Sequence, residues 1–206
     1  MDDSTPATLP APPTARQAID TLPEAARAFT VLLDRLEPAA WGAPSPCVGW
    51  TVRDVVDHVV TEHLWAPHLL RGESLEEVGD RYDGPVLGGS PDSARRAWRL
   101  AMLGSLQAWA QVEDVGQPVA SSTGGQSAGD YAHQMLLDLT VHAWDVARGG
   151  RVAQPLIHDA VGLSTAYEKP RVAAGEVAGI FAPPVRSASE HPMDQLAALL
   201  GRNPGR

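Results

Sequence analysis

Cysteine is nearly absent from this 206-residue chain, and its scarcity excludes one way of holding a fold together. Cys47 is the single cysteine, so an intramolecular disulfide framework is excluded and the composition fits a reducing cytoplasm. Nothing in the proline-rich connector around Cys47 argues for a lowered thiol pKa. We therefore interpret Cys47 as an inert thiol.

A basic surface is missing as well. The chain has 16 lysines and arginines against 25 aspartates and glutamates, a net charge of −9 at pH 7. This balance argues against nucleic acid and anionic membrane surfaces as partners, because no basic patch is available to neutralise phosphate. No apolar run approaches the length of a membrane span. The N-terminus also lacks the basic-then-apolar order of a signal peptide, so we expect a cytoplasmic protein.

Apolar residues recur at intervals of three and four, which predicts an all-α fold. We expect main helices at 14–36, 52–71, 91–112 and 127–149, a shorter helix at 156–168 and an apolar turn at 196–200. Pro23 is expected to split the first helix or to mark its true first turn. Gly149 and Gly150 are expected to end the fourth helix.

The segments between these helices read as loops, and the N-terminus reads as an arm. Residues 1–13 contain four prolines and little to bury, so we expect them to be disordered. Residues 73–89 are acidic and glycine-rich, and 113–126 are polar and glycine-rich. The domain expectation is one helical bundle over 14–206, with a core at 14–149 and a C-terminal appendix at 150–206.

The helix predicted at 127–149 carries the most informative pair of side chains. Asp138 and His142 are four residues apart, so both project from one face with neighbouring tips. Apolar residues cover most of the remaining surface of this helix, which indicates that it is buried. Burying a carboxylate beside an imidazole is costly unless the two hold a proton or a metal between them.

The second predicted helix can bring a further imidazole to the same interior. Thr51 and Asp54 form a capping-box-like start for this helix, and His58 lies two turns further along its apolar edge. Bundle cores build metal sites from inward ligands on facing helices, and two histidines with one carboxylate leave coordination positions open. Zinc is the default ion for such a set, with nickel, iron and manganese compatible. Spacing alone favours a hydrogen-bonded Asp138–His142 pair over a metal.

Three more residues are candidates for catalysis or support. Glu62, Tyr131 and Asp145 are assigned to proton transfer or to supporting the ligands. Two of them have a simpler interpretation: Glu62 as a solvated helix residue, and Asp145 as an anchor to Arg53 or another arginine. The six tryptophans are interpreted as core or end-cap residues. The histidines interpreted as surface or rim residues are His63, His68, His133, His158 and His191.

Two segments carry a resemblance to a known family. They read PCVGWTVRDVVDHVV from Pro46 and DLTVHAWDVARG from Asp138. They resemble the mycothiol-dependent maleylpyruvate isomerase family and its DinB-like metalloprotein relatives. The C-terminal LAALLGRNPGR is similar to the closing motif of an uncharacterised actinobacterial branch. The resemblance implies a DinB-like four-helix bundle and a divalent metal held by His58, Asp138 and His142.

The chain departs from the isomerase pattern in two places. The isomerase has glutamate where this chain has Asp138, so the metal would sit closer to the second of the two helices, bind through water or be lost. The isomerase also carries a separate C-terminal domain that helps to build its active site. About 55 residues follow Gly149 here, too few for a second domain, which makes maleylpyruvate a poor substrate candidate.

These observations lead to one preferred function and three alternatives. We expect a metal-dependent enzyme whose metal lowers the pKa of a thiol, with mycothiol as the candidate, for isomerisation or S-transfer on a small electrophile. The alternatives are a metal- or ligand-binding module without catalysis, a metal-assisted hydrolase, and a scaffold in which Asp138 and His142 only form a hydrogen bond. A homodimer is compatible with the sequence, but no apolar stripe requires one.

Overall fold

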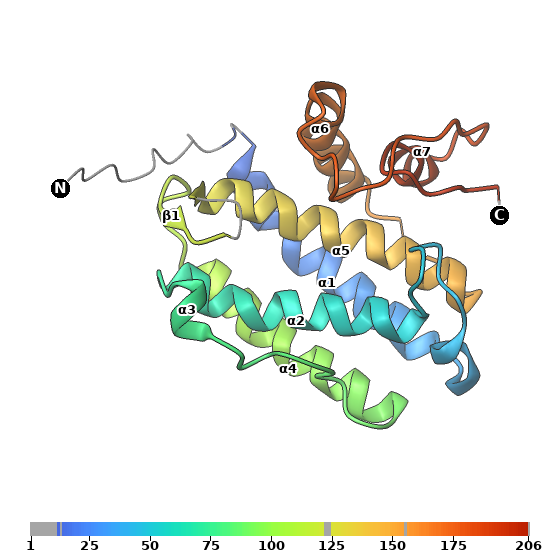
Figure 1. The fold of residues 1–206 in the computed structure, drawn as a ribbon, viewed down its shortest axis with the longest axis horizontal. Coiled ribbons are helices and arrows are strands. Elements are labelled where there is room, and N and C mark those ends of the chain that lie inside the picture. The colour runs from blue at the N-terminus through green and yellow to red at the C-terminus, as the bar shows by residue number, and fades with distance from the viewer. Residues whose placement is uncertain (1–11, 13, 122–124, 155, 206) are drawn as a thin grey trace.

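Four long helices form the body of the molecule in a computed structural model, which describes residues 12, 14–121, 125–154 and 156–205. They are α1 (Ala15–Arg35), α2 (Val52–Leu70), α4 (Pro91–Ala110) and α5 (Ala128–Gly150). Helix α1 packs on α5 and α4, and α2 packs on α4 and α5, which gives the bundle in Figure 1. The predicted all-α, DinB-like bundle is confirmed.

The helix starts follow the local chemistry of the sequence. Thr51 and Asp54 form a full capping box at α2, with Asp54 accepting from the Thr51 backbone N–H at 2.8 Å. Ser90 caps α4, whose first residue is Pro91. Ser127 caps α5 by accepting from the Asp130 backbone N–H. These caps fix where each helix begins, and the buried apolar faces then hold the helices together.

The prediction for Pro23 is wrong, and the helix predicted at 156–168 is longer than expected. Helix α1 runs through Pro23 without a break, and Pro23 is exposed while the opposite side of the helix carries buried residues such as Leu22 and Phe29. Helix α6 (His158–Ala174) likewise continues past Glu168 and through Pro170. In both helices an exposed proline removes one backbone hydrogen bond on the solvent side, and burial of the other side outweighs that loss.

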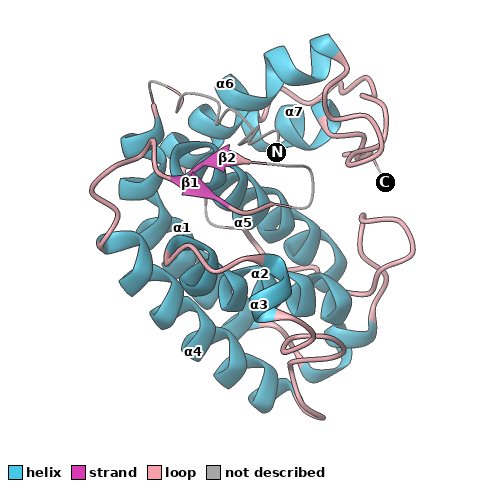
Figure 2. Ribbon diagram, turned by 60° about the vertical axis from the view of Figure 1, so that its left-hand side comes forward, coloured by secondary structure: helices cyan, strands magenta, loops and turns pink. Residues whose placement is uncertain are grey.

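The connectors contain short regular elements that the sequence did not predict. Residues 73–89 include a one-turn helix, α3 (Leu75–Val78), with its own capping box at Ser74. Strands β1 (Pro118–Val119) and β2 (Gln126–Ser127) pair antiparallel within 113–127. Figure 2 shows this small hairpin at the end of the bundle where α5 begins. A five-residue 3₁₀ helix at Pro38–Gly42 follows α1.

The C-terminal appendix packs against α5. Helix α6 contacts α5 and α1, and the short α7 (Pro192–Leu199) contacts α5 and α6. Figure 1 shows both helices on the side of α5 that faces away from α2 and α4. A second apolar cluster forms there around Trp144, Met193 and Leu196. The division into a core at 14–149 and an appendix at 150–206 stays a prediction, and the predicted disordered arm lies outside the described residues apart from Pro12.

Gly149, near the end of α5, allows a close contact with the connector before α2. The helix ends with Gly149 and Gly150, as predicted, and the left-handed capping position that follows is taken by Arg151, φ 54°. A Cβ on Gly149 would lie 2.7 Å from Val52 Cγ2 and 2.9 Å from the Pro44 carbonyl oxygen. The missing side chain therefore lets the connector before α2 approach α5 closely.

Candidate metal centre

Helices α2 and α5 bring His58, Asp138 and His142 together, as the sequence predicted. One oxygen of Asp138, Oδ1, lies 3.2 Å from His58 Nε2 and 3.1 Å from His142 Nε2. One candidate ligand atom from each of the three residues lies within 4.8 Å of the others. His142 is nearly buried, with 6% of its side chain exposed, while His58 and Asp138 retain 31% and 25%. The cluster is therefore closed on one side and open on the other.

The other nitrogen of His142 is committed to a different carboxylate. Asp145 Oδ2 lies 2.9 Å from His142 Nδ1, and the Asp145 side chain is fully buried. Arg202 donates to Asp145 at 2.9 Å, so Asp145 is the acceptor in this contact as well. Nδ1 of His142 must therefore carry the proton, and in a neutral ring Nε2 then presents a lone pair to Asp138.

A lone pair facing a carboxylate oxygen at 3.1 Å is repulsive unless something positive lies between them. Either His142 holds a second proton or a cation occupies the position among the three residues. Protein ligands bind zinc at about 2.0–2.2 Å, which places two tetrahedral ligand atoms about 3.4 Å apart. The observed separations of 3.1 and 3.2 Å are close to that value. The residues present fit a divalent metal.

Without a metal, the charges of the cluster stabilise one another through protons. Burial by itself lowers the pKa of His142, but Asp138 and Asp145 together raise it to about 9. Burial also acts to lower the pKa of His58, and Asp138 raises it above its ordinary value. Burial acts to raise the pKa of Asp138, yet the two histidines hold it well below its usual range. Protons and a metal therefore compete for the same nitrogen atoms.

Trp50 covers the imidazoles from the connector before α2. Its ring is stacked on His142, with centroids 6.1 Å apart and planes 17° apart. It meets His58 edge-on at 5.2 Å. The sequence placed Trp50 among core or end-cap residues, and its position beside the cluster is a feature that spacing could not reveal. The close approach that Gly149 permits brings this connector to α5.

A cavity of about 260 Å³ opens on the exposed side of the cluster. His58 and Asp138 line it together with Glu62 and Tyr131. Burial first, and then Asp138, raise the pKa of Glu62. The Tyr131 hydroxyl is buried without a hydrogen-bond partner among the described residues, and burial raises its pKa well above the ordinary value. Tyr131 therefore keeps its proton near neutral pH, and the Glu62 carboxyl keeps its proton to a higher pH than an exposed glutamate does.

The far wall of the cavity comes from the C-terminal appendix. Glu168, Arg171 and Phe181 line it. One oxygen of the buried Glu168, Oε2, lacks a hydrogen-bond partner among the described residues, and burial raises the pKa of this carboxyl group. Sequence reasoning missed this wall because 170–184 show no helical period. The appendix nevertheless helps to enclose the cavity.

Asp145 does not line the cavity, in contrast to Glu62 and Tyr131. It lies behind His142, where it contacts the ring and Arg202. The expectation that Asp145 anchors its helix to an arginine is met by Arg202 rather than Arg53. From this position Asp145 can support His142, but it does not contact a molecule in the cavity.

Two histidines were wrongly assigned to the surface or rim. His63 is 1% exposed and His133 is fully buried; His63 packs edge-on against Trp98, and His133 lies 2.9 Å from the Thr14 hydroxyl. His158 and His191 are exposed, as predicted. Burial raises the pKa of the Cys47 thiol, which agrees with its interpretation as inert.

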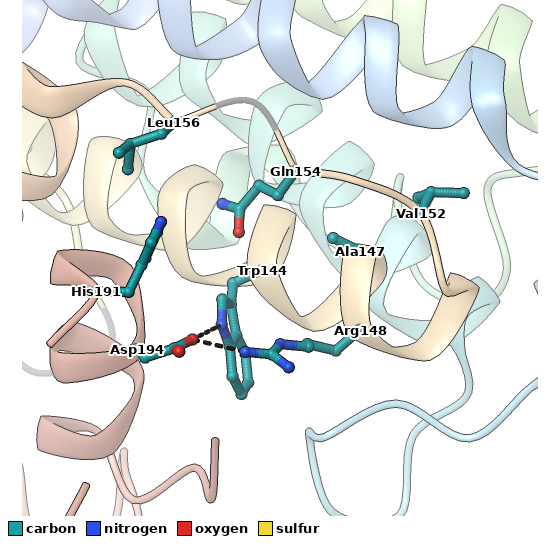
Figure 3. Close-up of a pocket in the computed structure, with 8 residues that line it drawn as sticks. All are labelled: Trp144, Ala147, Arg148, Val152, Gln154, Leu156, His191 and Asp194. Atoms are coloured by element: carbon teal, nitrogen blue, oxygen red, sulfur yellow. Dashed lines mark hydrogen bonds and ion pairs between the residues drawn. The ribbon is translucent and has the colours of Figure 1, made fainter. Parts of the chain in front are cut away.

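A second cavity, of about 250 Å³, lies between α5 and the appendix. Figure 3 shows Asp194, one of the lining residues, joined to Trp144 and Arg148 from α5. The carboxylate and the guanidinium therefore satisfy each other. These contacts join the appendix to α5.

The helical bundle and the three-residue cluster on α2 and α5 define a class: DinB-like proteins with a candidate metal centre between two helices. Residues 22–147 match the mycothiol maleylpyruvate isomerase N-terminal domain family. Because this match covers more than half of the chain, the chain belongs to that family.

Similar proteins and structures agree with this assignment. Uncharacterised proteins of Mycobacterium tuberculosis, from strains CDC 1551 / Oshkosh and ATCC 25618 / H37Rv, are each 27% identical over 195 residues, with 85% of this chain and 92% of theirs covered. The crystal structure of the mycothiol-dependent maleylpyruvate isomerase superposes with a TM-score of 0.59 at 17% identity, and that of a mutant with 0.61 at 16%. Both superpositions cover 78% of this chain and 72% of the isomerase, and they show a shared fold. No helix in the described part of the chain has the length and apolar character needed to cross a membrane.

Proposed function

We propose that the protein is a divalent-metal enzyme that uses a thiol, with mycothiol as the candidate, for isomerisation or S-transfer on a small electrophile. The metal ligands are His58, Asp138 and His142, and zinc is the expected ion, with nickel, iron or manganese as substitutes. We place the activity in the cytoplasm. Membership of the isomerase family supports the thiol.

One observation carries the metal part of the proposal. His58 Nε2 and His142 Nε2 both converge on a single carboxylate oxygen, at 3.2 and 3.1 Å, while the second nitrogen of His142 is bound to Asp145. A cation among the three atoms would take the place of the protons that otherwise hold this arrangement together.

The open side of the cluster supports the thiol chemistry. A metal bound there would lower the pKa of a coordinated thiol, so that the thiolate is the nucleophile at neutral pH. Thiolate addition to an electrophilic carbon leaves an electron pair on a neighbouring atom, which must take up a proton. Glu62 lines the same cavity with a raised pKa, and we assign it to deliver that proton and, in isomerisation, to take it back.

Tyr131 is assigned a binding role on the same wall. Its buried hydroxyl has no hydrogen-bond partner among the described residues, and its raised pKa keeps it protonated. It can therefore donate a hydrogen bond to an oxygen of the electrophile. A bound molecule with such an acceptor would also relieve the cost of an unpaired buried hydroxyl.

The test combines elemental analysis with a thiol-dependent assay. The full-length protein, purified without chelator, is compared with His58→Ala, His142→Ala and, as a matched control, His158→Ala, which removes an exposed histidine. We expect about one divalent metal per chain in the parent and the control, and its loss from the two cluster variants with the helical circular dichroism signal unchanged. Glu62→Gln should keep the metal and lose about 10²- to 10⁴-fold in thiol-dependent turnover.

The alternatives give different results in the same experiment. Bound metal without thiol-dependent turnover of any electrophile in a screen would indicate a binding module, and turnover without thiol would indicate metal-assisted hydrolysis. A parent that holds no metal, even after reloading with zinc or nickel, would overturn the proposal and leave the Asp138–His142 pair as a structural hydrogen bond.

A further inference from the structure

The C-terminal tail reaches the back of the candidate metal centre through one arginine. Arg202 Nη2 donates to Asp145 Oδ2 at 2.9 Å, and Arg202 Nε donates to Asp145 Oδ1 at 3.1 Å. Only 8% of the Arg202 side chain is exposed. This two-pronged contact joins residues 57 positions apart and fixes the plane of a fully buried carboxylate.

The same carboxylate holds His142. Asp145 Oδ2 takes the Nδ1 contact at 2.9 Å, so Arg202, Asp145 and His142 form one continuous chain of polar contacts. A buried carboxylate bonded to a metal-ligating histidine fixes the ring orientation and keeps the ligating nitrogen free of its proton. The arginine in turn holds that carboxylate in the orientation that meets the His142 ring.

The tail is shaped to put Arg202 in this place. Gly201 has φ +80°, and a Cβ there would lie 2.6 Å from both Cβ and the carbonyl oxygen of Ala182. The Arg202 backbone N–H donates to the Ala197 carbonyl at 2.9 Å. Leu200 is buried against α5 in the second apolar cluster. The turn after α7 is therefore fixed by its contacts with Ala182, Ala197 and the second apolar cluster, and Arg202 points inward.

We propose that Arg202 is a positioning residue of the metal centre, so that the C-terminal tail is a working part of the site that the bundle alone would leave incomplete. Arg202 acts through Asp145 on His142 and touches neither the metal nor the substrate. The inference rests on the proposed function for the metal itself. Its geometric part, the alignment of His142 by the tail, stands apart from the metal.

The chain supplies a matched control in a second ion pair between α5 and the appendix. Arg148 Nη2 donates to Asp194 Oδ1 at 2.8 Å, in the arrangement that Figure 3 shows. This pair also joins α5 to the C-terminal segment, but none of its contacts involves His142 or Asp145. Removing it tests the effect of loosening the appendix without disturbing the polar chain.

The first measurement is metal affinity in the full-length protein. Zinc is titrated against a chromogenic chelator for the parent, Arg202→Gln and Arg148→Gln. We expect Arg202→Gln to weaken zinc binding about 10- to 100-fold, with Arg148→Gln within about twofold of the parent. If Arg202→Gln fails to fold, Arg202→Lys keeps the positive charge without the two-pronged contact and should still bind zinc several-fold more weakly. Equal affinities in the parent and the folded Arg202 variant would overturn the inference.

The second measurement separates this inference from the proposed function. In the metal-free parent, ¹⁵N-edited NMR should show a downfield, solvent-protected Nδ1–H signal that His142→Ala removes. We expect Arg148→Gln to keep this signal and Arg202→Gln to lose or broaden it. A signal unchanged in Arg202→Gln refutes the positioning role even if zinc binds tightly. Loss of the signal in a protein that binds no metal refutes the proposed function and leaves the alignment by the tail in place.

Discussion

His63 should make the protein sensitive to acid, although it lies outside the candidate site. It is 1% exposed on α2, and neither ring nitrogen has a hydrogen-bond partner among the described residues. The ring of Trp98 meets it edge-on at 4.9 Å. Burial lowers its pKa from 6.5 to about 4, with Asp138 opposing the shift. The folded protein therefore excludes a proton that the unfolded chain accepts.

The sign and size of the effect follow from the two pKa values. A histidine with a lowered folded pKa contributes its full stability above pH 6.5, and that contribution is lost as the pH falls toward 4. A difference of about 2.5 units at 1.36 kcal/mol per unit gives about 3 kcal/mol. Such a loss is a large fraction of the free energy of unfolding of an ordinary domain, which is about 5–15 kcal/mol.

The assay compares urea unfolding of the parent with that of two variants, at pH 7.5 and pH 4. His63→Gln keeps a buried polar group that does not titrate, and His63→Leu replaces it with an apolar one of similar size. We expect the stability of each variant relative to the parent to rise by about 3 kcal/mol between the two pH values. The effects of all other titrating groups cancel in this comparison.

The two variants separate titration from polarity. His63→Leu should also be more stable than His63→Gln by about 1–3 kcal/mol at both pH values, because it leaves no unpaired buried group. Parallel pH profiles for the parent and His63→Gln would refute the reasoning, since His63 would then not be a buried neutral histidine.

Two further predictions concern the elements that position the site. Thr51→Ala removes the capping box that starts α2 and should cost about 1 kcal/mol in chemical unfolding; a change below about 0.3 kcal/mol would show that Asp54 alone maintains the cap. Gly149→Ala should lower the free energy of unfolding by about 1–3 kcal/mol, because its Cβ would overlap Val52. Gly162 on α6 has open space around it, so Gly162→Ala should be neutral or stabilising by up to about 1 kcal/mol. Equal effects of the two substitutions would contradict the close approach of the connector to Gly149.

The long helices could be predicted because their signals are local. Periodic apolar residues and capping residues lie within a few positions of the structure that they specify, as at Thr51 and Ser90. Pro23 misled the prediction, and the continuation of α6 through Pro170 was not foreseen, because the balance between a lost backbone hydrogen bond and a buried helix face depends on what packs against that face. Such packing is a property of the whole fold.

The residues of the candidate site also divide into those marked by local spacing and those brought together only by packing. Asp138 and His142 share a helix face, so their spacing alone placed them together, and His58 followed from the geometry of a bundle. The Arg202–Asp145 contact joins residues 57 positions apart, and no periodicity marks it. The tail motif was visible in the sequence, but its arginine had no assigned partner until the packing of α7 on α5 was known.

The structure bears on how Asp138 would ligate a metal in place of the glutamate of the isomerase. A water between the metal and Asp138 would lengthen the path between them by a hydrogen bond of about 2.7 Å. Asp138 Oδ1 instead lies 3.2 Å from His58 Nε2 and 3.1 Å from His142 Nε2. Separations of this size match those between two ligand atoms on one zinc ion, so we expect that a bound ion would lie close to α5.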